Sequence, residues 1–179
     1  MATGLLAEHV GRNESFSLLD VGAASGDLGA AFQSRFPRAR VVSVDRQLRN
    51  LRKAAQPKLA ADAFALPFRP RGFDFVFCSL LLHEYPDAEI LRLLRDLWTL
   101  AKRALIALDL YRHPLAYHFL PATRWLFRWH EVTAHDGPAS VGAAFRPGEL
   151  RRLASGAGLR QSRVRLHWPW FRVSLVAWR

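Results

Sequence analysis

"SLLDVGAASGDLG", residues 17–29, is an apolar segment that runs directly into a turn of small residues and then into a helical pattern. Residues 17–22 predict a buried strand, and residues 27–36 predict the helix that follows it. Backbone N–H groups in a glycine-containing turn of this kind approach a nucleotide-like ligand closely. The turn therefore decides both the fold and the class of ligand to expect.

Strand and helix patterns alternate along the rest of the chain, which predicts a mostly parallel sheet with crossover helices. The last two apolar-alternating segments, 162–168 and 171–178, are joined through Pro169 and predict an antiparallel hairpin at the sheet edge. We expect an α/β fold with a Rossmann-like, doubly wound sheet. Its remaining strands are predicted at 40–45, near 58–66, at 73–82 and at 104–111, and its remaining helices at 46–55, from an N-cap at Asp87 to about 102, and at 147–159.

The 179 residues predict one domain, 1–179, with an insertion at about 112–146 that we interpret as short helices and a loop over the substrate. No apolar run approaches the roughly 18 residues that span a bilayer. The first residues lack the pattern of a signal peptide, and Cys78 is the only cysteine, so a cytoplasmic location is expected.

The chain is strongly basic, with a formal net charge of +11. Its arginines are spread along the sequence and form no block of five or six, which is typical of a solvated surface. A basic balance also suits nucleic acid, anionic lipid or an acidic substrate. The charge alone therefore does not make this a nucleic-acid-binding protein.

The turn after the first strand has two interpretations. As residues 24–29 it is a degenerate dinucleotide fingerprint, and as residues 20–26 it is an acidic strand end followed by small residues. A pyrophosphate requires bare N–H groups and a positive helix end, whereas Asp20 and Asp27 would place two carboxylates beside it. Those carboxylates attract the sulfonium and ammonium groups of S-adenosylmethionine, so charge favours a methyl donor.

The chain resembles the class I S-adenosylmethionine-dependent methyltransferases in five segments. These are "LLDVGAASGDLG", "VVSVD", "AADAFALPF", "FDFVFCSLLLHEYPD" and "FRPGELRRLASGAGL", in the order and spacing of the family. Within the superfamily, the third and fourth segments are most similar to the branch of quinone-biosynthesis methyltransferases and their small-molecule relatives. The resemblance covers roughly residues 15–111 and 145–179.

The resemblance implies a binding role in the cofactor site for ten residues. Asp20, Gly22, Ala24 and Gly26 would hold the methionine moiety and form the loop, and Asp45 would bind the ribose hydroxyls. The other positions would lie over the adenine, at its edge and near the transferred methyl group, and they are Arg46, Asp62, Ala63, Ser79 and Leu80. No metal site is assigned.

The chain departs from the family in two places. Ala24 stands where the family has a glycine, and alanine is tolerable there if its φ is negative. The family's helices before the first strand are almost absent, so part of the usual substrate lid is missing. A homodimer that closes the site therefore stays open as an alternative.

Methyl transfer requires an aligned nucleophile and, for a hydroxyl acceptor, a base that removes its proton. His83 follows the fourth predicted strand directly, and His135 is followed by Asp136, whose carboxylate could orient the imidazole. We favour His83 or His135 as the base, with Tyr117 as a further catalytic candidate. The remaining candidates are Glu84, Tyr85, His113, His118 and His130.

The insertion interleaves aromatic residues with arginines, as in "RWLFRW" at 124–129. An aromatic lid suits a flat or lipid-like small-molecule acceptor. The same residues could stack on nucleobases, rest on a membrane surface or cover the sheet edge as core. The insertion also resembles that of bacterial methyltransferases encoded with type III polyketide synthases, which act on phenolic or pyrone hydroxyls.

We therefore expect a small-molecule methyltransferase, with O-methylation of a phenol-like hydroxyl favoured over C-methylation. A nucleic-acid methyltransferase is the first alternative, although "SLLLHEY" at 79–85 lacks the Asn/Asp-Pro-Pro-Tyr type of motif. A non-catalytic protein that binds S-adenosylmethionine is the second.

Overall fold

A computed structural model describes residues 1–54, 57–114 and 142–179. Its strands form one mixed sheet in the order β3-β2-β1-β4-β5-β7-β6. Neighbours among β1–β5 pair in parallel, whereas β7 is antiparallel to both β5 and β6. The predicted α/β fold with an antiparallel hairpin at the sheet edge is confirmed. The strands are β1 (Phe16–Val21), β2 (Ala39–Asp45), β3 (Lys58–Ala60), β4 (Phe73–Ser79), β5 (Ala101–Leu110), β6 (Ser162–His167) and β7 (Arg172–Trp178).

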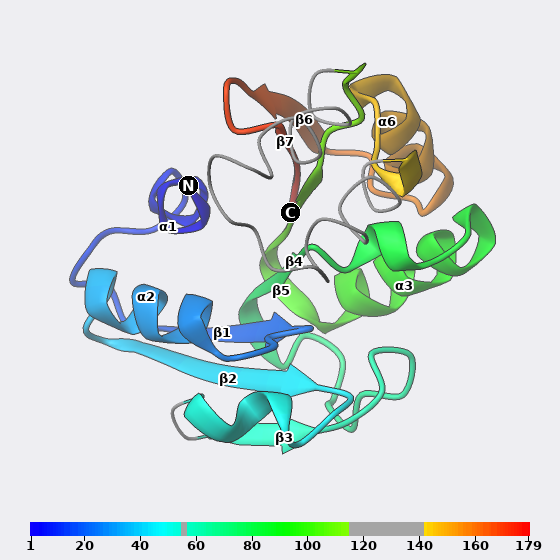
Figure 1. Cartoon of the computed structure of the whole chain (residues 1–179). Coiled ribbons are helices and arrows are strands. Elements are labelled where there is room, and N and C mark those ends of the chain that lie inside the picture. Colours follow the sequence, from blue (N-terminus) through cyan, green and yellow to red (C-terminus); the bar gives the residue numbers. More distant parts are fainter. Residues whose placement is uncertain (55–56, 115–141) are drawn as a thin grey trace, which may run out of the picture.

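Helices cover both faces of the sheet (Figure 1). The first pair packs on one face, where Phe32 meets Phe77 at a centroid distance of 5.0 Å, and the second pair packs on the other face through buried leucines such as Leu93 and Leu150. Because β4 is covered on both faces, its apolar run does not alternate with polar residues. The two pairs are α1 (Ala2–Ala7) with α2 (Asp27–Arg35), and α3 (Asp87–Leu100) with α6 (Pro147–Gly156).

The prediction of a basic helix over 46–55 is wrong. The described part of this segment has one short 3-10 helix, η1 (Asn50–Lys53). The ammonium of Lys58 donates to the carbonyl oxygens of Leu51 at 2.8 Å and Ala54 at 3.2 Å. A side chain from the next strand thus satisfies carbonyls that a longer helix would pair with its own N–H groups.

The fourth strand is shorter than predicted. The sequence pattern placed it at 73–82, but it ends at Ser79, because Leu80 has a φ of +54°. The short 3-10 helix η2 (Leu82–Glu84) follows, and Leu82 remains completely buried. An apolar run shows burial but does not distinguish a strand from a buried turn.

The helix predicted to follow has its N-cap one residue earlier than expected. The predicted N-cap, Asp87, is the first residue of α3, and the N-cap is Pro86.

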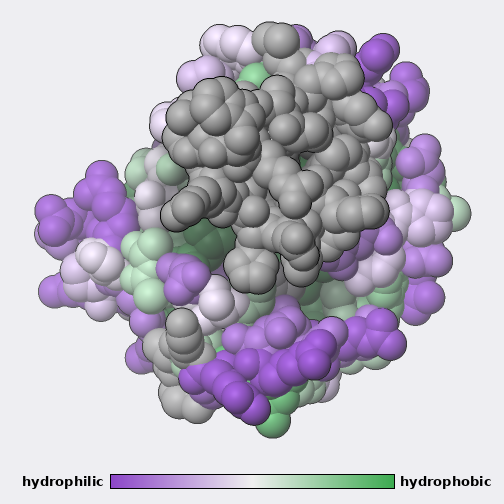
Figure 2. All heavy atoms as spheres, viewed as in Figure 1, coloured by the Kyte–Doolittle hydropathy of each residue, from purple (hydrophilic) through white to green (hydrophobic). Residues whose placement is uncertain are grey.

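Hydrophilic residues lie along the edge of the molecule that carries η1 and β3 in Figure 1, as Figure 2 shows. Within the part of the chain that the structure describes, no helix is long and apolar enough to cross a membrane. The centre of the insertion, 115–141, lies outside the described residues, so its predicted helices and lid role stay predictions.

Candidate functional site

The loop between β1 and α2 has three residues with positive φ. Gly22, Ala24 and Gly26 have φ values of +73°, +45° and +78°. The N–H of Gly26 donates to the carbonyl oxygen of Ala23 at 2.8 Å, which closes the turn just before α2 begins. The opening stretch of the sequence therefore forms a tight backbone loop at the carboxyl ends of the parallel strands, where α/β proteins bind ligands.

Ala24 does not meet the condition that we set for it. Its φ is positive, in a region that costs a residue with a Cβ about 1 kcal/mol or more. The conformation is held from outside, because the N–H of Ala24 donates to Oδ2 of Asp45 at 3.0 Å. The alanine is thus tolerated through a tertiary hydrogen bond and not through a relaxed backbone.

Asp45 joins this loop to the segment after β2. Besides Ala24, its carboxylate accepts the N–H of Gln47 at 2.8 Å and the side-chain amide of Asn50 at 3.0 Å, both through Oδ1. The carboxylate also lines the cavity beside the loop. A carboxylate fixed in this way at the end of the second strand is placed as ribose binding requires.

The cavity beside the loop has a volume of about 480 Å³, within the range of small-molecule sites. Two of the predicted cofactor residues, Asp20 and Gly26, are absent from the described lining. The predicted residues that do line it are Gly22, Ala24, Asp45, Arg46, Asp62, Ala63, Ser79 and Leu80. Sequence reasoning gave no role to Ser25, Gln47 and Asn50, which also line it. Asp27, whose charge we expected to attract the donor, and the catalytic candidates Glu84 and Tyr85 line it as well. The cofactor roles of all these residues stay predictions.

Asp20 lies beneath the loop and is 1% exposed. Neither of its carboxylate oxygens has a hydrogen-bond partner among the described residues. Burial raises the pKa of Asp20 from 3.8 to about 7. An unpartnered carboxylate behind a ligand-binding loop fits a group that attracts positive charge to the site, although it has no direct contact with the cavity.

The charged side chains in the described lining of the cavity are predominantly acidic. It includes four carboxylates and a single cationic side chain, that of Arg46. Such a lining favours a positively charged ligand over a pyrophosphate. The four carboxylates are those of Asp27, Asp45, Asp62 and Glu84.

His83 is absent from the described lining of this cavity, and its Nδ1 contacts a side chain of β5. Its Nδ1 lies 2.7 Å from Oδ1 of Asp109, a side chain that is 1% exposed. The Asp109 carboxylate also accepts the N–H groups of Leu82 at 2.9 Å and Leu110 at 2.7 Å. Because a carboxylate only accepts hydrogen bonds, Nδ1 keeps its hydrogen and donates it to Asp109, and the neutral imidazole carries its lone pair on Nε2.

The charge of Asp109 also changes the basicity of His83. The hydrogen bond from the imidazole to Asp109 raises the pKa of His83 above 6.5, against an opposing effect of burial. The arrangement is a carboxylate-oriented imidazole, as in general-base sites. Sequence reasoning missed Asp109, since the only signal was one acid near the end of an apolar strand, 26 residues away.

Five of the other catalytic candidates lie within 115–141, outside the residues that the structure describes. They are Tyr117, His118, His130, His135 and Asp136. His113 is described, and its ring lies 5.5–5.7 Å from three aromatic rings, those of Tyr111, Trp168 and Phe171. His113 thus belongs to an aromatic cluster at the turn of the hairpin, between β6 and β7.

Comparison with known proteins gives the same class of fold. The family model described as "Methyltransferase domain" matches residues 18–104. A curated relative, malonyl-[acyl-carrier protein] O-methyltransferase of Dechloromonas aromatica (strain RCB), is 32% identical over 167 residues, or 89% of this chain. The chain spans 60% of the length of that relative.

Two solved structures share the fold. A SAM-dependent methyltransferase from Aquifex aeolicus has a TM-score of 0.67 at 18% identity, over 98% of this chain and 88% of its own. Magnesium protoporphyrin IX methyltransferase from Synechocystis PCC 6803, with bound SAH, also has a TM-score of 0.67 at 18% identity, over 99% of this chain and 80% of its own. At this identity the likeness establishes the fold alone.

Proposed function

We propose that this chain, which belongs to the class I S-adenosylmethionine-dependent methyltransferases, binds S-adenosylmethionine in the acidic cavity and methylates a hydrophobic small-molecule acceptor. The observation that carries the proposal is the pairing of a tight loop with the carboxylate of Asp45 at the rim of the same cavity. The acidic lining suits a ligand that carries a sulfonium and an ammonium group, and it disfavours the pyrophosphate of a dinucleotide.

Individual residues have distinct proposed roles in holding the donor. Asp45 accepts the ribose hydroxyls, and Asp62 lies at the adenine edge, where its Oδ1 already accepts the N–H of Phe64 at 2.9 Å. Ser79 and Leu80 lie where β4 ends, near the methyl group. The bound donor supplies an electrophilic methyl group, so the protein has to align the acceptor and remove its proton.

We assign the proton transfer from a phenol-like hydroxyl to His83. Nδ1 is hydrogen-bonded to Asp109, so Nε2 is the nitrogen that accepts the hydroxyl proton while the hydroxyl oxygen of the acceptor substrate takes the methyl group. His83 lies in η2 after β4, with 11% of its side chain exposed, next in sequence to Glu84, which lines the donor cavity. His83 therefore lies at the boundary between the donor cavity and the β5 side of the site.

A second acceptor class is a carboxylate borne by an acyl carrier. The named substrate of the Dechloromonas relative supports it, as does the net charge of +11, which suits an acidic carrier. A carboxylate is already ionised at neutral pH and needs no base. Dependence on His83 therefore distinguishes this acceptor from a phenol.

The test measures S-adenosylhomocysteine formation with phenols, quinols, a malonyl-carrier conjugate and RNA, across pH, for wild type and His83→Gln. For a phenol, the wild-type kcat/KM should rise with pH through an apparent pKa above 6.5, because the neutral imidazole is the active form. The variant should lose this pH dependence and about 10²–10⁴-fold in rate. His167→Gln, on the hairpin, is the control and should leave the profile unchanged.

Three other outcomes would decide the base, the acceptor and whether the chain is catalytic. An unchanged profile in His83→Gln contradicts the assignment of the base, and turnover of the malonyl conjugate alone replaces the phenol by a carboxylate. Binding of the donor without transfer to any acceptor supports the non-catalytic alternative.

A further inference from the structure

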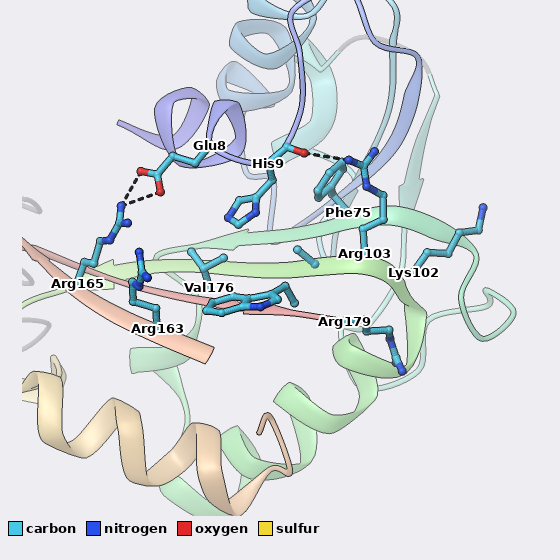
Figure 3. Close-up of a pocket in the computed structure, with 11 residues that line it drawn as sticks. Glu8, His9, Phe75, Lys102, Arg103, Arg163, Arg165, Val176 and Arg179 are labelled. Carbon is cyan, nitrogen blue, oxygen red and sulfur yellow. Dashed lines mark hydrogen bonds and ion pairs between the residues drawn. The ribbon is translucent and has the colours of Figure 1, made fainter. Parts of the chain in front are cut away.

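A second cavity lies at the opposite ends of the parallel strands from the donor site. It has a volume of about 470 Å³ and is lined where β5 begins, at Lys102, Arg103 and Ala104. Figure 3 shows it as a groove between the end of α1 and the sheet. The groove is independent of the proposed methyl-transfer site, because the described linings of the two cavities share no residue.

The floor of the groove is apolar and aromatic. It is formed by Phe75 of β4 and by Val176 and Trp178 of β7. The ring of His9 lies over this floor, with its centroid 6.4 Å from that of Trp178 and an interplanar angle of 31°. Phe75 is completely buried beneath the Arg103 guanidinium, so Trp178 provides the surface on which a flat ring can stack.

The rim of the groove is cationic. Glu8 is the only acid among the described lining residues, and both of its oxygens contact Nη1 of Arg165, at 2.6 and 2.7 Å. Arg163, beside it, forms no ion pair with any described residue. The cationic lining residues are Lys102, Arg103, Arg163, Arg165 and Arg179.

The cations of the groove differ in what they already contact. Lys102 lies 3.7 Å from a carboxylate oxygen of Asp74, and the Arg179 guanidinium lies 4.3 Å from the ring centroid of Trp98, whereas Arg163 pairs with no described carboxylate. Figure 3 shows Arg163 and Arg165 at one end and Lys102 and Arg179 at the other, with His9 between them. Burial lowers the pKa of His9, and the nearby arginines lower it further against the effect of Glu8, so the imidazole is neutral at physiological pH. The middle of the groove is therefore uncharged, and Arg163 supplies positive charge at one end.

We propose that this groove binds a small organic polyanion with a flat heteroaromatic ring, of the mononucleotide class. The ring would stack on Trp178 beside His9, and the phosphates would pair with Arg163, whose guanidinium donates to no described residue. A flat bilayer does not fit a concave groove between a helix and a sheet. A symmetric second copy would bring its own cations against these.

The proposal is tested by calorimetric titration of the full chain with GTP, guanosine, inorganic triphosphate and a decaglutamate peptide. GTP should bind most tightly, with guanosine and triphosphate each at least about tenfold weaker, because each lacks half of the contacts. Arg163→Gln should weaken GTP binding about tenfold or more, through loss of charge-assisted hydrogen bonds. Because Arg163 is exposed and forms no ion pair with the residues that the structure describes, the variant should keep the wild-type melting temperature.

Arg152→Gln is the matched control, since it removes the same charge from an exposed position on α6. It should leave the affinity for GTP unchanged, as should Asp45→Asn in the donor cavity. The proposal is overturned if Arg152→Gln weakens binding as much as Arg163→Gln, or if GTP does not bind. It is also overturned if triphosphate or the peptide binds as tightly as GTP, which would indicate a simple anion site or an acidic polypeptide partner.

Discussion

Asp20 and Ala24 are both held in unfavourable states within four residues of each other. Ala24 has a positive φ, and Asp20 is a buried carboxylate without a partner among the described residues. Strain and unpaired charge of this kind concentrate where a protein binds a ligand. The loop therefore stores a cost in stability at the same place where the donor is proposed to bind.

Asp20→Asn should make the free energy of unfolding less dependent on pH. Because folding raises the pKa of Asp20 from 3.8 to about 7, the folded chain retains a proton that the unfolded chain releases. Wild-type stability therefore falls as pH rises between those values, by up to about 4 kcal/mol. Relative to wild type, the variant should gain stability from about pH 4 to about pH 8, measured by denaturant unfolding.

Asp96→Asn provides the control for this measurement, since that carboxylate is 47% exposed on α3. It should leave the difference from wild type nearly constant across the same pH range. Parallel stability curves for Asp20→Asn and wild type would show that the Asp20 carboxylate is solvated or paired in the folded chain.

The loop after β1 and η1 fit against each other so closely that only glycine is accommodated at 26. A Cβ at this position would lie 2.4 Å from Cβ and 2.5 Å from Cα of Ala54, and φ is +78°. Gly26→Ala should therefore lower the melting temperature, with a loss of about 1–3 kcal/mol, and should weaken donor binding because the loop has to move.

Gly4→Ala in α1 is the matched control for Gly26→Ala, since no atom outside the helix and its neighbours lies within 4 Å of the added Cβ. It should be neutral or stabilising by up to about 1 kcal/mol. Equal melting temperatures for Gly26→Ala and wild type would contradict the close contact between the loop and η1.

Sequence periodicity predicted most strands and helices, because β1, β2, α3 and the final hairpin have strong patterns. It failed where tertiary contacts decide the local structure. Lys58 satisfies the carbonyls of η1 from outside, and the apolar residues after Ser79 are buried in a turn and not in a strand. Neither interaction is visible in a local pattern.

Much of the donor-cavity lining could be predicted from the ends of the predicted strands. Asp45, Asp62 and Ser79 all follow or end strands, and they converge at the carboxyl ends of the parallel strands. The sequence did not reveal Asn50, which reaches the site through the fold of the turn after β2. Nor did it reveal Asp109, which lies in a different strand from its partner His83.

The two edges of the sheet differ in charge. Carboxylates gather at the carboxyl ends of the parallel strands, and lysine and arginine side chains gather in the groove at the amino ends. A net charge of +11 is thus compatible with an acidic donor cavity, because Arg46 is the only basic residue in the described lining of that cavity. This separation allows a cationic donor and an anionic ligand to bind the same domain at different sites.

The central claim is that the cavity beside Asp45 holds S-adenosylmethionine, and calorimetric titration with S-adenosylmethionine, S-adenosylhomocysteine and NADH tests it most directly. The first two should bind to the wild type and NADH should not. Asp45→Asn should weaken both affinities about tenfold or more, since the ribose loses a charged acceptor, while Asp96→Asn should not change them. Binding of NADH alone, or affinities that are unchanged in Asp45→Asn, would contradict the claim.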